Sequence, residues 1–531
     1  MIHKIILIKI ILFTLPLISA ETKKPNILFL FADDLGKHAS AYAKVDGPGT
    51  VNDVIKTPNF DKLAKTGVLF TNAFVNSPSC TPCRSSLLSG RHFWQTCQGA
   101  ILQGAVWDMK IPSYPLMLKN NGYHIGKSYK VWGPGSVKDA PYGGQKYNYS
   151  DFGQKMNDFS FVVQKGKSIE VNKQLLMNEV RENFRSFMKE KDKDKPFCYW
   201  FGPTNVHRKW VQGSGLKQWG INPDELKGKM PPFLPDVAAI REDLADYFGE
   251  VQAFDMAIGV LVDELKKMGE LENTLIVISG DHGAPGFPHG KCNLYDFGAN
   301  VPLLITGPGV KGGRVLNDFV SLPDLAPTFL EAAGLEKDKG MSAKSLWPSL
   351  KSDKNEQADP TRTHVFIGRE RHVSVAREGG LPYPQRAIRT KDFLFIINFK
   401  PERWPMGDPK LLGTDKEPSV KALTNDTRVT LADEDAGPTK AWMVMNRVEW
   451  KEAFQKAYGK RPMYELYDLK KDPHQMKNVA ADETYKDQLN ELKKTLMDEL
   501  KKTSDPRLID DGKFFETPPM TNIKPGKKKK K

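Results

Sequence analysis

The chain has 531 residues, of which 40% are hydrophobic and 27% charged, a composition typical of a soluble globular protein. This length allows one large domain and a smaller one. The formal net charge is +14, and six of the lysines lie in the last eight residues. A basic balance favours polyanionic partners, but no nucleic-acid-binding motif accompanies it. Five cysteines are an odd and sparse set, which argues against a disulfide framework.

The first twenty residues predict an export signal. A basic start with Lys4 precedes a mostly apolar run over 5–18, and Ser19-Ala20 resembles a cleavage site. The run is too short for a convincing membrane span, and no later apolar stretch reaches 18 residues. We therefore expect residues 1–20 to be a signal peptide on an exported, periplasmic or secreted protein with no stable membrane span. An uncleaved N-terminal anchor is the alternative.

The first mature element is a continuous apolar run over 26–32, which predicts a strand buried on both faces of a parallel sheet. Asp33 and Asp34 follow it directly. The carboxyl ends of such strands are where α/β proteins place their active sites. Paired carboxylates suit a hard divalent cation, although an Asp pair that caps the next helix is the alternative reading.

A predicted helix over 57–67 and a strand over 68–74 lead to the stretch Ser79-Cys80-Thr81-Pro82-Cys83-Arg84. The next residues predict the first turns of a helix. Cys80 would then lie near a helix N-terminus, where backbone N–H groups favour developing negative charge, with Arg84 one turn along. The Cys-x-x-Cys spacing also allows a redox pair, half a zinc site, or a structural disulfide among Cys80, Cys83 and Cys97.

Two further buried strands are predicted, and each is followed by polar side chains. The strand over 196–201 precedes His207 and Arg208, and the strand over 274–279 precedes Asp281 and His282. The expected helices cover residues 113–122, 172–190 and 240–269, the last with a core-facing stripe of period 3.6. Residues 135–174, rich in Gly, Lys, Asp and Tyr, predict a long loop over the pocket.

Beyond residue 375 the pattern changes. Residues 386–390 and 393–398 predict paired antiparallel strands, and 484–502 predict a helix. The expected fold is therefore α/β, with a large mostly parallel sheet sandwiched by helices and a smaller C-terminal α+β subdomain carrying an antiparallel sheet. The expected divisions are a catalytic domain over 21–375, the subdomain over 376–510 and a basic disordered tail over 511–531.

The stretch from Cys80 to Arg84 resembles the Cys-x-Pro-x-Arg signature of the type I sulfatases of the alkaline phosphatase superfamily. Further matches appear in the family's order over roughly residues 25–500. They are Asp33-Asp34, Lys130 with Trp132 where a His is usual, His207, Gly280-Asp281-His282-Gly283, and Gly290-Lys291.

This resemblance implies that a maturation enzyme oxidises Cys80 to formylglycine (3-oxoalanine). In the hydrated aldehyde one oxygen attacks sulfur and the other then expels the sulfate. The roles implied for other residues are contact with the formylglycine for Arg84, sulfate binding for Lys130 and Lys291, and general-acid action for His207. The implied metal ligands are Asp33, Asp34, Cys80, Asp281 and His282, binding Ca²⁺ or alternatively Mg²⁺.

The segments 132–135, 369–372 and 403–409 look similar to the bacterial N-sulfoglucosamine sulfohydrolase-like branch. The similarity implies that Arg371 and His372 line a substrate subsite, with surface salt bridging as the alternative. Arg208 is a further candidate contact for an anionic substrate. The implied function is hydrolysis of sulfate esters or sulfamates on a sulfated polysaccharide, of the heparan type or algal such as ulvan. A phosphoesterase of the same superfamily and a non-catalytic glycan-binding protein with unmodified Cys80 are the alternatives.

Overall fold

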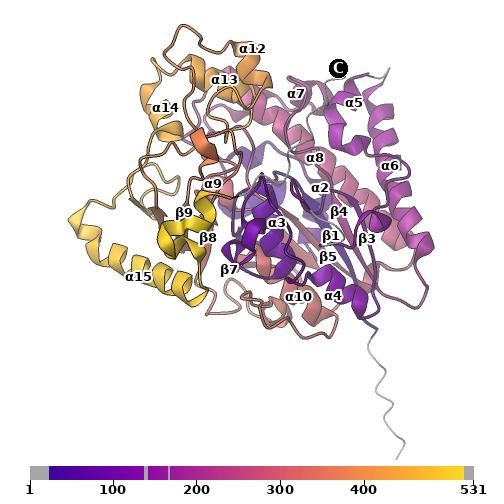
Figure 1. The fold of residues 1–531 in the computed structure, drawn as a ribbon. Helices are drawn as coiled ribbons and strands as arrows, with labels where there is room; N and C mark the ends of the chain where they lie inside the picture. The colour runs from indigo at the N-terminus through magenta and orange to yellow at the C-terminus, as the bar shows by residue number, and fades with distance from the viewer. Residues whose placement is uncertain (1–22, 137–140, 166–167, 519–531) are drawn as a thin grey trace, which may run out of the picture.

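The computed structural model describes residues 23–136, 141–165 and 168–518 (Figure 1). The predicted signal peptide over 1–20 and the lysine-rich end of the chain lie outside these residues. Within them, no helix combines the length and the apolar character that a membrane crossing requires.

A seven-stranded sheet is the centre of the larger part of the described chain, in the order β3-β4-β1-β5-β6-β2-β7. All neighbours in it are parallel except β6, which runs antiparallel to both β5 and β2. The predicted mostly parallel sheet is therefore confirmed. The strands are β1 (Asn26–Ala32), β2 (Val68–Phe74), β3 (His124–Tyr129), β4 (Phe197–Gly202), β5 (Thr274–Gly280), β6 (Leu303–Thr306) and β7 (Arg314–Ser321).

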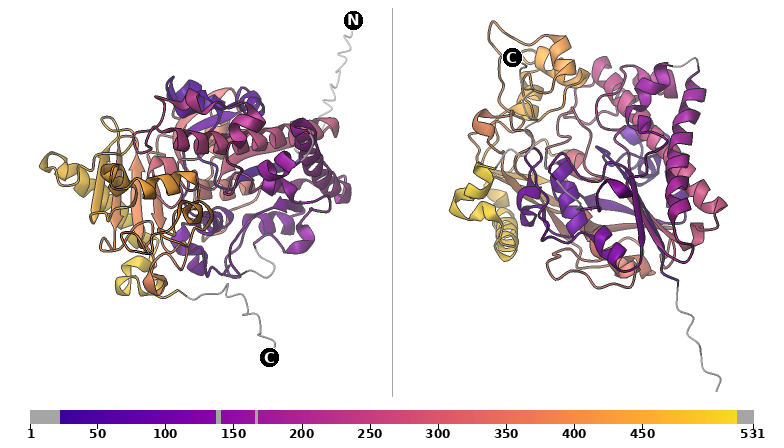
Figure 2. Two further views of the ribbon diagram at one scale, coloured as in Figure 1. Left: turned by 90° about the horizontal axis from the view of Figure 1, so that it is seen from above. Right: turned by 45° about the vertical axis from the view of Figure 1, so that its right-hand side comes forward.

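The position of strand β1 in the sheet explains why its sequence is apolar from Ile27 to Ala32. Successive side chains of a strand point to opposite faces, and both faces of this sheet are covered by helices (Figure 2). Leu28 and Leu30 join the core beneath α6 (Ile169–Glu190) and α8 (Ala238–Lys267). Phe29 and Phe31 join the core on the other face, beneath α3 (Cys80–Ser89), α4 (Tyr114–Asn120) and α10 (Leu325–Ala332). Every β1 side chain from Ile27 to Ala32 is fully buried.

The helices of this larger part include the five that the sequence predicts, over 57–67, after Cys80, and over 113–122, 172–190 and 240–269. They are α1 (Ser40–Asp46), α2 (Pro58–Ala64), α3 (Cys80–Ser89), α4 (Tyr114–Asn120), α5 (Phe159–Lys165), α6 (Ile169–Glu190), α7 (Ser214–Trp219), α8 (Ala238–Lys267), α9 (Asp296–Ala299), α10 (Leu325–Ala332) and α11 (Trp347–Lys351). The predicted long loop over 135–174 is partly wrong, because α5 and the first turn of α6 lie within it. Met156, Phe159 and Val163 are buried in the core, which fixes this segment in place.

A second, four-stranded antiparallel sheet has the order β11-β10-β9-β8 and lies beside β7 (Figure 1). Helix α15 packs Leu492, Leu496 and Leu500 against it, as the predicted α+β subdomain requires. Strand β8 precedes residue 375, so the second sheet begins before the predicted division. The remaining elements are β8 (His364–Arg369), β9 (Gln385–Thr390), β10 (Phe393–Asn398), β11 (Tyr464–Asp468), α12 (Val420–Asn425), α13 (Pro438–Met445), α14 (Lys451–Tyr458), α15 (Lys486–Lys502) and α16 (Lys513–Glu516).

The start of the predicted disordered tail is folded in the structure. Residues 513–516 form α16, Phe515 is buried, and Glu516 accepts hydrogen bonds from Arg403 and Arg507, each at 2.6 Å. The expectation of disorder over 511–518 is therefore wrong. An aromatic side chain and a paired carboxylate hold this segment on the subdomain.

Candidate active site

Three neighbouring parallel strands deliver the predicted polar residues to one edge of the large sheet. Because β4, β1 and β5 are adjacent and parallel, their carboxyl ends meet there. Asp33 and Asp34 follow β1, Asp281 and His282 follow β5, and His207 lies on the loop after β4. The backbone of Asp34 is left-handed (φ 61°), and its N–H donates to the Asp281 carboxylate at 2.7 Å.

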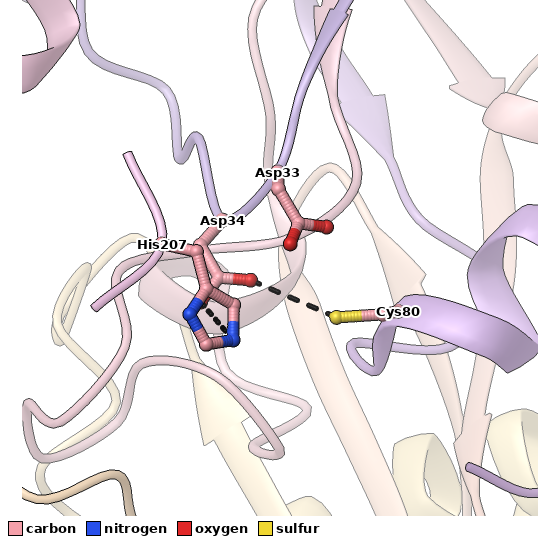
Figure 3. A group of neighbouring side chains, drawn as sticks. All are labelled: Asp33, Asp34, Cys80 and His207. Atoms are coloured by element: carbon pink, nitrogen blue, oxygen red, sulfur yellow. Dashed lines mark hydrogen bonds and ion pairs between the residues drawn. The ribbon is translucent and has the colours of Figure 1, made fainter. Parts of the chain in front are cut away.

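Cys80 is the first residue of α3 and points at this edge. Figure 3 shows its side chain directed toward the Asp34 carboxylate. The Sγ atom lies 3.8 Å from Asp34 Oδ1 and 3.4 Å from His282 Nε2. Burial, together with the negative charge of Asp33, raises the pKa of the thiol well above its usual value. Within the described chain all five cysteines are free, so the alternative of a structural disulfide among Cys80, Cys83 and Cys97 is wrong.

The ligand types and their burial fit a divalent cation. Ligand atoms of Asp34, Cys80, Asp281 and His282 all lie within 4.8 Å of one another, and so do those of Asp33, Asp34, Cys80 and His207. All five predicted ligands belong to these two groups. The carboxylates are fully or almost fully buried, where a concentration of negative charge needs positive charge to balance it.

Arg84 supplies part of that positive charge. Its guanidinium is fully buried and bridges the two sides of the cluster, donating to Asp33 Oδ1 at 2.8 Å and to Asp281 Oδ2 at 2.9 Å. It also donates to the backbone carbonyls of Lys130 and Val131. All these contacts come from the second turn of α3, and the predicted contact of Arg84 with formylglycine stays a prediction.

Lys130 approaches the same carboxylate from the end of β3. Its Nζ lies 2.7 and 2.8 Å from the two oxygens of Asp33. Burial opposes the charge on Asp33, but Lys130 and Arg84 outweigh it and hold the pKa of this carboxyl well below its usual value. Trp132, at the position of the family's usual His, donates its indole N–H to Ser85 Oγ on α3 at 2.8 Å.

Lys291 makes three charged or polar contacts at once. Its Nζ lies 3.0 Å from Asp34 Oδ2, 3.0 Å from His207 Nε2 and 3.1 Å from Asp435 Oδ2. Burial opposes the ammonium charge, yet Asp34 and Asp435 raise the pKa of Lys291 well above its usual value. His207 Nε2 accepts from this ammonium, and its Nδ1–H donates to the Arg208 carbonyl at 2.5 Å.

Asp435 is a site residue that the sequence analysis missed. It comes from the segment before α13, far along the chain, and no strand or known motif precedes it. The acidic run Asp433-Glu434-Asp435 is the only local signal, and such a run is typical of a solvated surface. Only the fold shows that this segment returns to the catalytic centre.

Arg208 does not have the exposed position expected of a substrate contact. Its guanidinium pairs with both oxygens of Asp243 on α8, at 2.9 and 2.6 Å, and its side chain is only 5% exposed. It also stacks on Trp210. The expectation that Arg208 meets an anionic substrate is corrected by this bidentate pair, which gives it a structural role.

Arg371 and His372 are both buried, so the alternative of surface salt bridging is wrong for them. His372 Nδ1 lies 2.8 Å from the hydroxyl of Ser79, the residue before Cys80, and burial lowers the pKa of this imidazole to about 3. Arg371 donates to the carbonyls of Gln103 and Pro518. A role for either in substrate binding stays a prediction.

The chain is similar to known sulfatases over most of its length. The sulfatase family model matches residues 25–335. Human N-sulphoglucosamine sulphohydrolase is 29% identical over 519 residues, which cover 91% of each chain. An ulvan-active sulfatase of Formosa agariphila is 25% identical over 511 residues, covering 89% of this chain and 74% of that protein.

A solved structure in complex with its substrate D-glucosamine-2-N,6-O-disulfate shares the fold. It has a TM-score of 0.57 at 19% identity, covering 91% of this chain and 99% of the other. The family match spans more than half of the chain and includes β1, Cys80, His207 and Asp281. The protein therefore belongs to the sulfatase family.

Proposed function

We propose that this sulfatase hydrolyses sulfate esters or sulfamates of a sulfated carbohydrate, using a formylglycine made from Cys80 and a bound divalent cation. The observation that carries the proposal is the convergence of Arg84, Lys130, His207 and Lys291 on the buried carboxylates around Cys80 Sγ. In the hydrated aldehyde, a reactive oxygen would replace this sulfur on the same side-chain carbon. The aldehyde would supply a nucleophile that releases sulfate by reforming its carbonyl.

Asp33, Asp34, Asp281 and His282 would hold the cation, and sulfatases generally use a metal ion. Oxygen-rich ligation favours Ca²⁺, with Mg²⁺ as the alternative. Lys130 forms an ion pair with Asp33, and Lys291 forms one with Asp34. Both ammonium groups would therefore lie close to the nucleophile derived from Cys80. There they would stabilise negative charge that develops on the sulfuryl oxygens.

His207 is suited to protonate the leaving group. Its side chain is 31% exposed, which makes it the most open of the polar groups around Cys80. The Arg208 carbonyl fixes the ring orientation through Nδ1, which leaves Nε2 directed at the site. After Nε2 has taken up a proton, an imidazole placed in this way could deliver it to an alcohol or amine as it departs.

The substrate class and location follow from the sequence and the relatives. An export signal and a basic chain favour an extracellular or periplasmic sulfated glycan as the partner. The named relatives act on N-sulfoglucosamine and on ulvan, so heparan-type and algal glycans are both proposed. A formylglycine-generating enzyme would be the second partner.

The test is to coexpress the chain with a formylglycine-generating enzyme and determine the mass of the tryptic peptide over 66–84. Maturation should lower its mass by about 18 Da relative to the unmodified cysteine. The matured protein should release sulfate from N-sulfoglucosamine, glucosamine 6-sulfate or ulvan oligosaccharides, and turn over 4-nitrophenyl sulfate faster than 4-nitrophenyl phosphate.

Two variants make the result specific. Cys80→Ala should abolish both the mass change and turnover, while Cys83→Ser, one turn along the same helix, should retain both. Faster turnover of the phosphate would favour the phosphoesterase alternative. Glycan binding without turnover, unchanged in Cys80→Ala, would favour a binding protein.

A further inference from the structure

The carboxylate of Asp435 lies beside Lys291 of the catalytic centre, and only one of its two oxygens forms this ion pair. Its Oδ2 forms the ion pair with Lys291 Nζ, and the side chain is 16% exposed. Within the described chain no hydrogen bond engages Oδ1. Burial opposes the charge on Asp435, but the ammonium of Lys291 outweighs it and holds the pKa of this carboxyl below its usual value.

The position of Asp435 is fixed by contacts on both sides along the chain. Two residues earlier, Asp433 pairs with Arg369 at 2.5 Å and with Arg377 at 2.7 Å. Four residues later, the N–H and the hydroxyl of Thr439 both donate to Asp243 Oδ2, at 3.1 and 2.6 Å. Because the segment is attached on both sides of Asp435, the position of the Asp435 carboxylate is fixed.

Arg208 completes this attachment by filling the space between two glycines. A Cβ at Gly286 would lie 2.4 Å from Arg208 Nε, and one at Gly437 would lie 2.5 Å from its Cζ. The same Cβ at Gly286 would lie 2.9 Å from the backbone carbonyl of Asp435. The segment carrying Asp435 therefore packs directly on the loop between Asp281 and Lys291.

A fixed negative charge beside a sulfate-binding lysine is unfavourable for an anion unless the substrate brings it a hydrogen-bond donor. The two bonds that a sulfatase can break differ in this respect. The bridging oxygen of a sulfate ester carries only lone pairs, which a carboxylate repels. The nitrogen of a sulfamate carries an N–H, which a carboxylate accepts as a charge-assisted hydrogen bond.

We propose that Asp435 is a specificity-determining residue that accepts a hydrogen bond from the nitrogen of a sulfamate, so that the preferred substrate is an N-sulfated amino sugar. This inference rests on the proposed function. In the overall reaction the S–N bond breaks and one water is consumed: R–NH–SO₃⁻ + H₂O gives R–NH₃⁺ + SO₄²⁻. The ammonium product keeps its N–H groups beside Asp435, whereas the alcohol released from an ester brings no positive charge.

The test compares the matured wild type with Asp435→Asn on N-sulfoglucosamine and on 4-nitrophenyl sulfate. A charge-assisted hydrogen bond contributes about 1.5–3 kcal/mol, so kcat/KM for the sulfamate should fall roughly ten- to hundredfold relative to that for the ester. The matched control is Asp426→Asn, a half-exposed carboxylate on the same segment, which should leave the ratio unchanged. Melting temperatures verify that each variant is folded.

A second measurement uses the wild type alone. Glucosamine should inhibit ester turnover at least tenfold more strongly than glucose does, because only its ammonium group meets Asp435. An equal fall of kcat/KM for both substrates in Asp435→Asn would overturn the inference and leave Asp435 as a positioning residue for Lys291. A wild type that cleaves esters but no sulfamate would overturn it as well. If protein with confirmed formylglycine cleaves neither, the proposed function itself fails.

Discussion

Replacing Arg84 with methionine should destabilise the protein strongly. The guanidinium is fully buried, forms ion pairs of 2.8 and 2.9 Å with two buried carboxylates, and donates to two backbone carbonyls. Methionine fills similar space but leaves Asp281 without this cation, while Asp33 keeps Lys130. Breaking a buried ion pair by removing one partner costs about 3–5 kcal/mol.

The assay is thermal unfolding in EDTA, so that no bound cation replaces the lost charge. The melting temperature of Arg84→Met should fall by roughly 5 °C or more. The melting temperature of Arg84→Lys should fall less, because a single ammonium keeps the positive charge but cannot contact both carboxylates. Arg428→Met is the control, since that side chain is 75% exposed and its ion pair contributes about 1 kcal/mol or less. A melting temperature within 1 °C of the wild type for Arg84→Met would refute the reasoning.

Three further predictions concern other parts of the molecule. Burial raises the pKa of Glu250 from 4.5 to about 7, so the folded protein holds this proton over a range in which the unfolded chain has released it. Stability should therefore fall as pH rises from about 4.5 to 7, and a pH series of melts should show a smaller fall for Glu250→Gln. Leu496→Ala on α15, at a fully buried position, should cost about 2–5 kcal/mol in denaturant unfolding, and a loss below about 1 kcal/mol would contradict the packing described. Arg208→Met should lower kcat/KM more for the sulfamate than for the ester, because it loosens the attachment of the segment that carries Asp435; equal losses for both substrates would contradict that role of Arg208.

Local sequence determined most of the fold and the centre of the site. A run such as 27–32 that is apolar at every position requires cover on both faces, so a parallel sheet with helices on either side follows. The sequence also predicts that the residues following three such runs lie at one edge of the sheet, as Asp34, His207 and Asp281 do. Cys80 and Arg84 are one turn apart on the same helix, so their convergence is also a local property.

Contacts between distant segments decided the rest. The sequence could not show that Arg208 pairs with Asp243, because an arginine after a strand looks alike whether it faces a substrate or a carboxylate 35 residues away. Nor could it place Asp435, whose position depends on Asp433 and Thr439 finding partners on β8 and α8. Periodicity reports which face of an element is buried, whereas the pairing of buried charges depends on which elements the tertiary structure brings together.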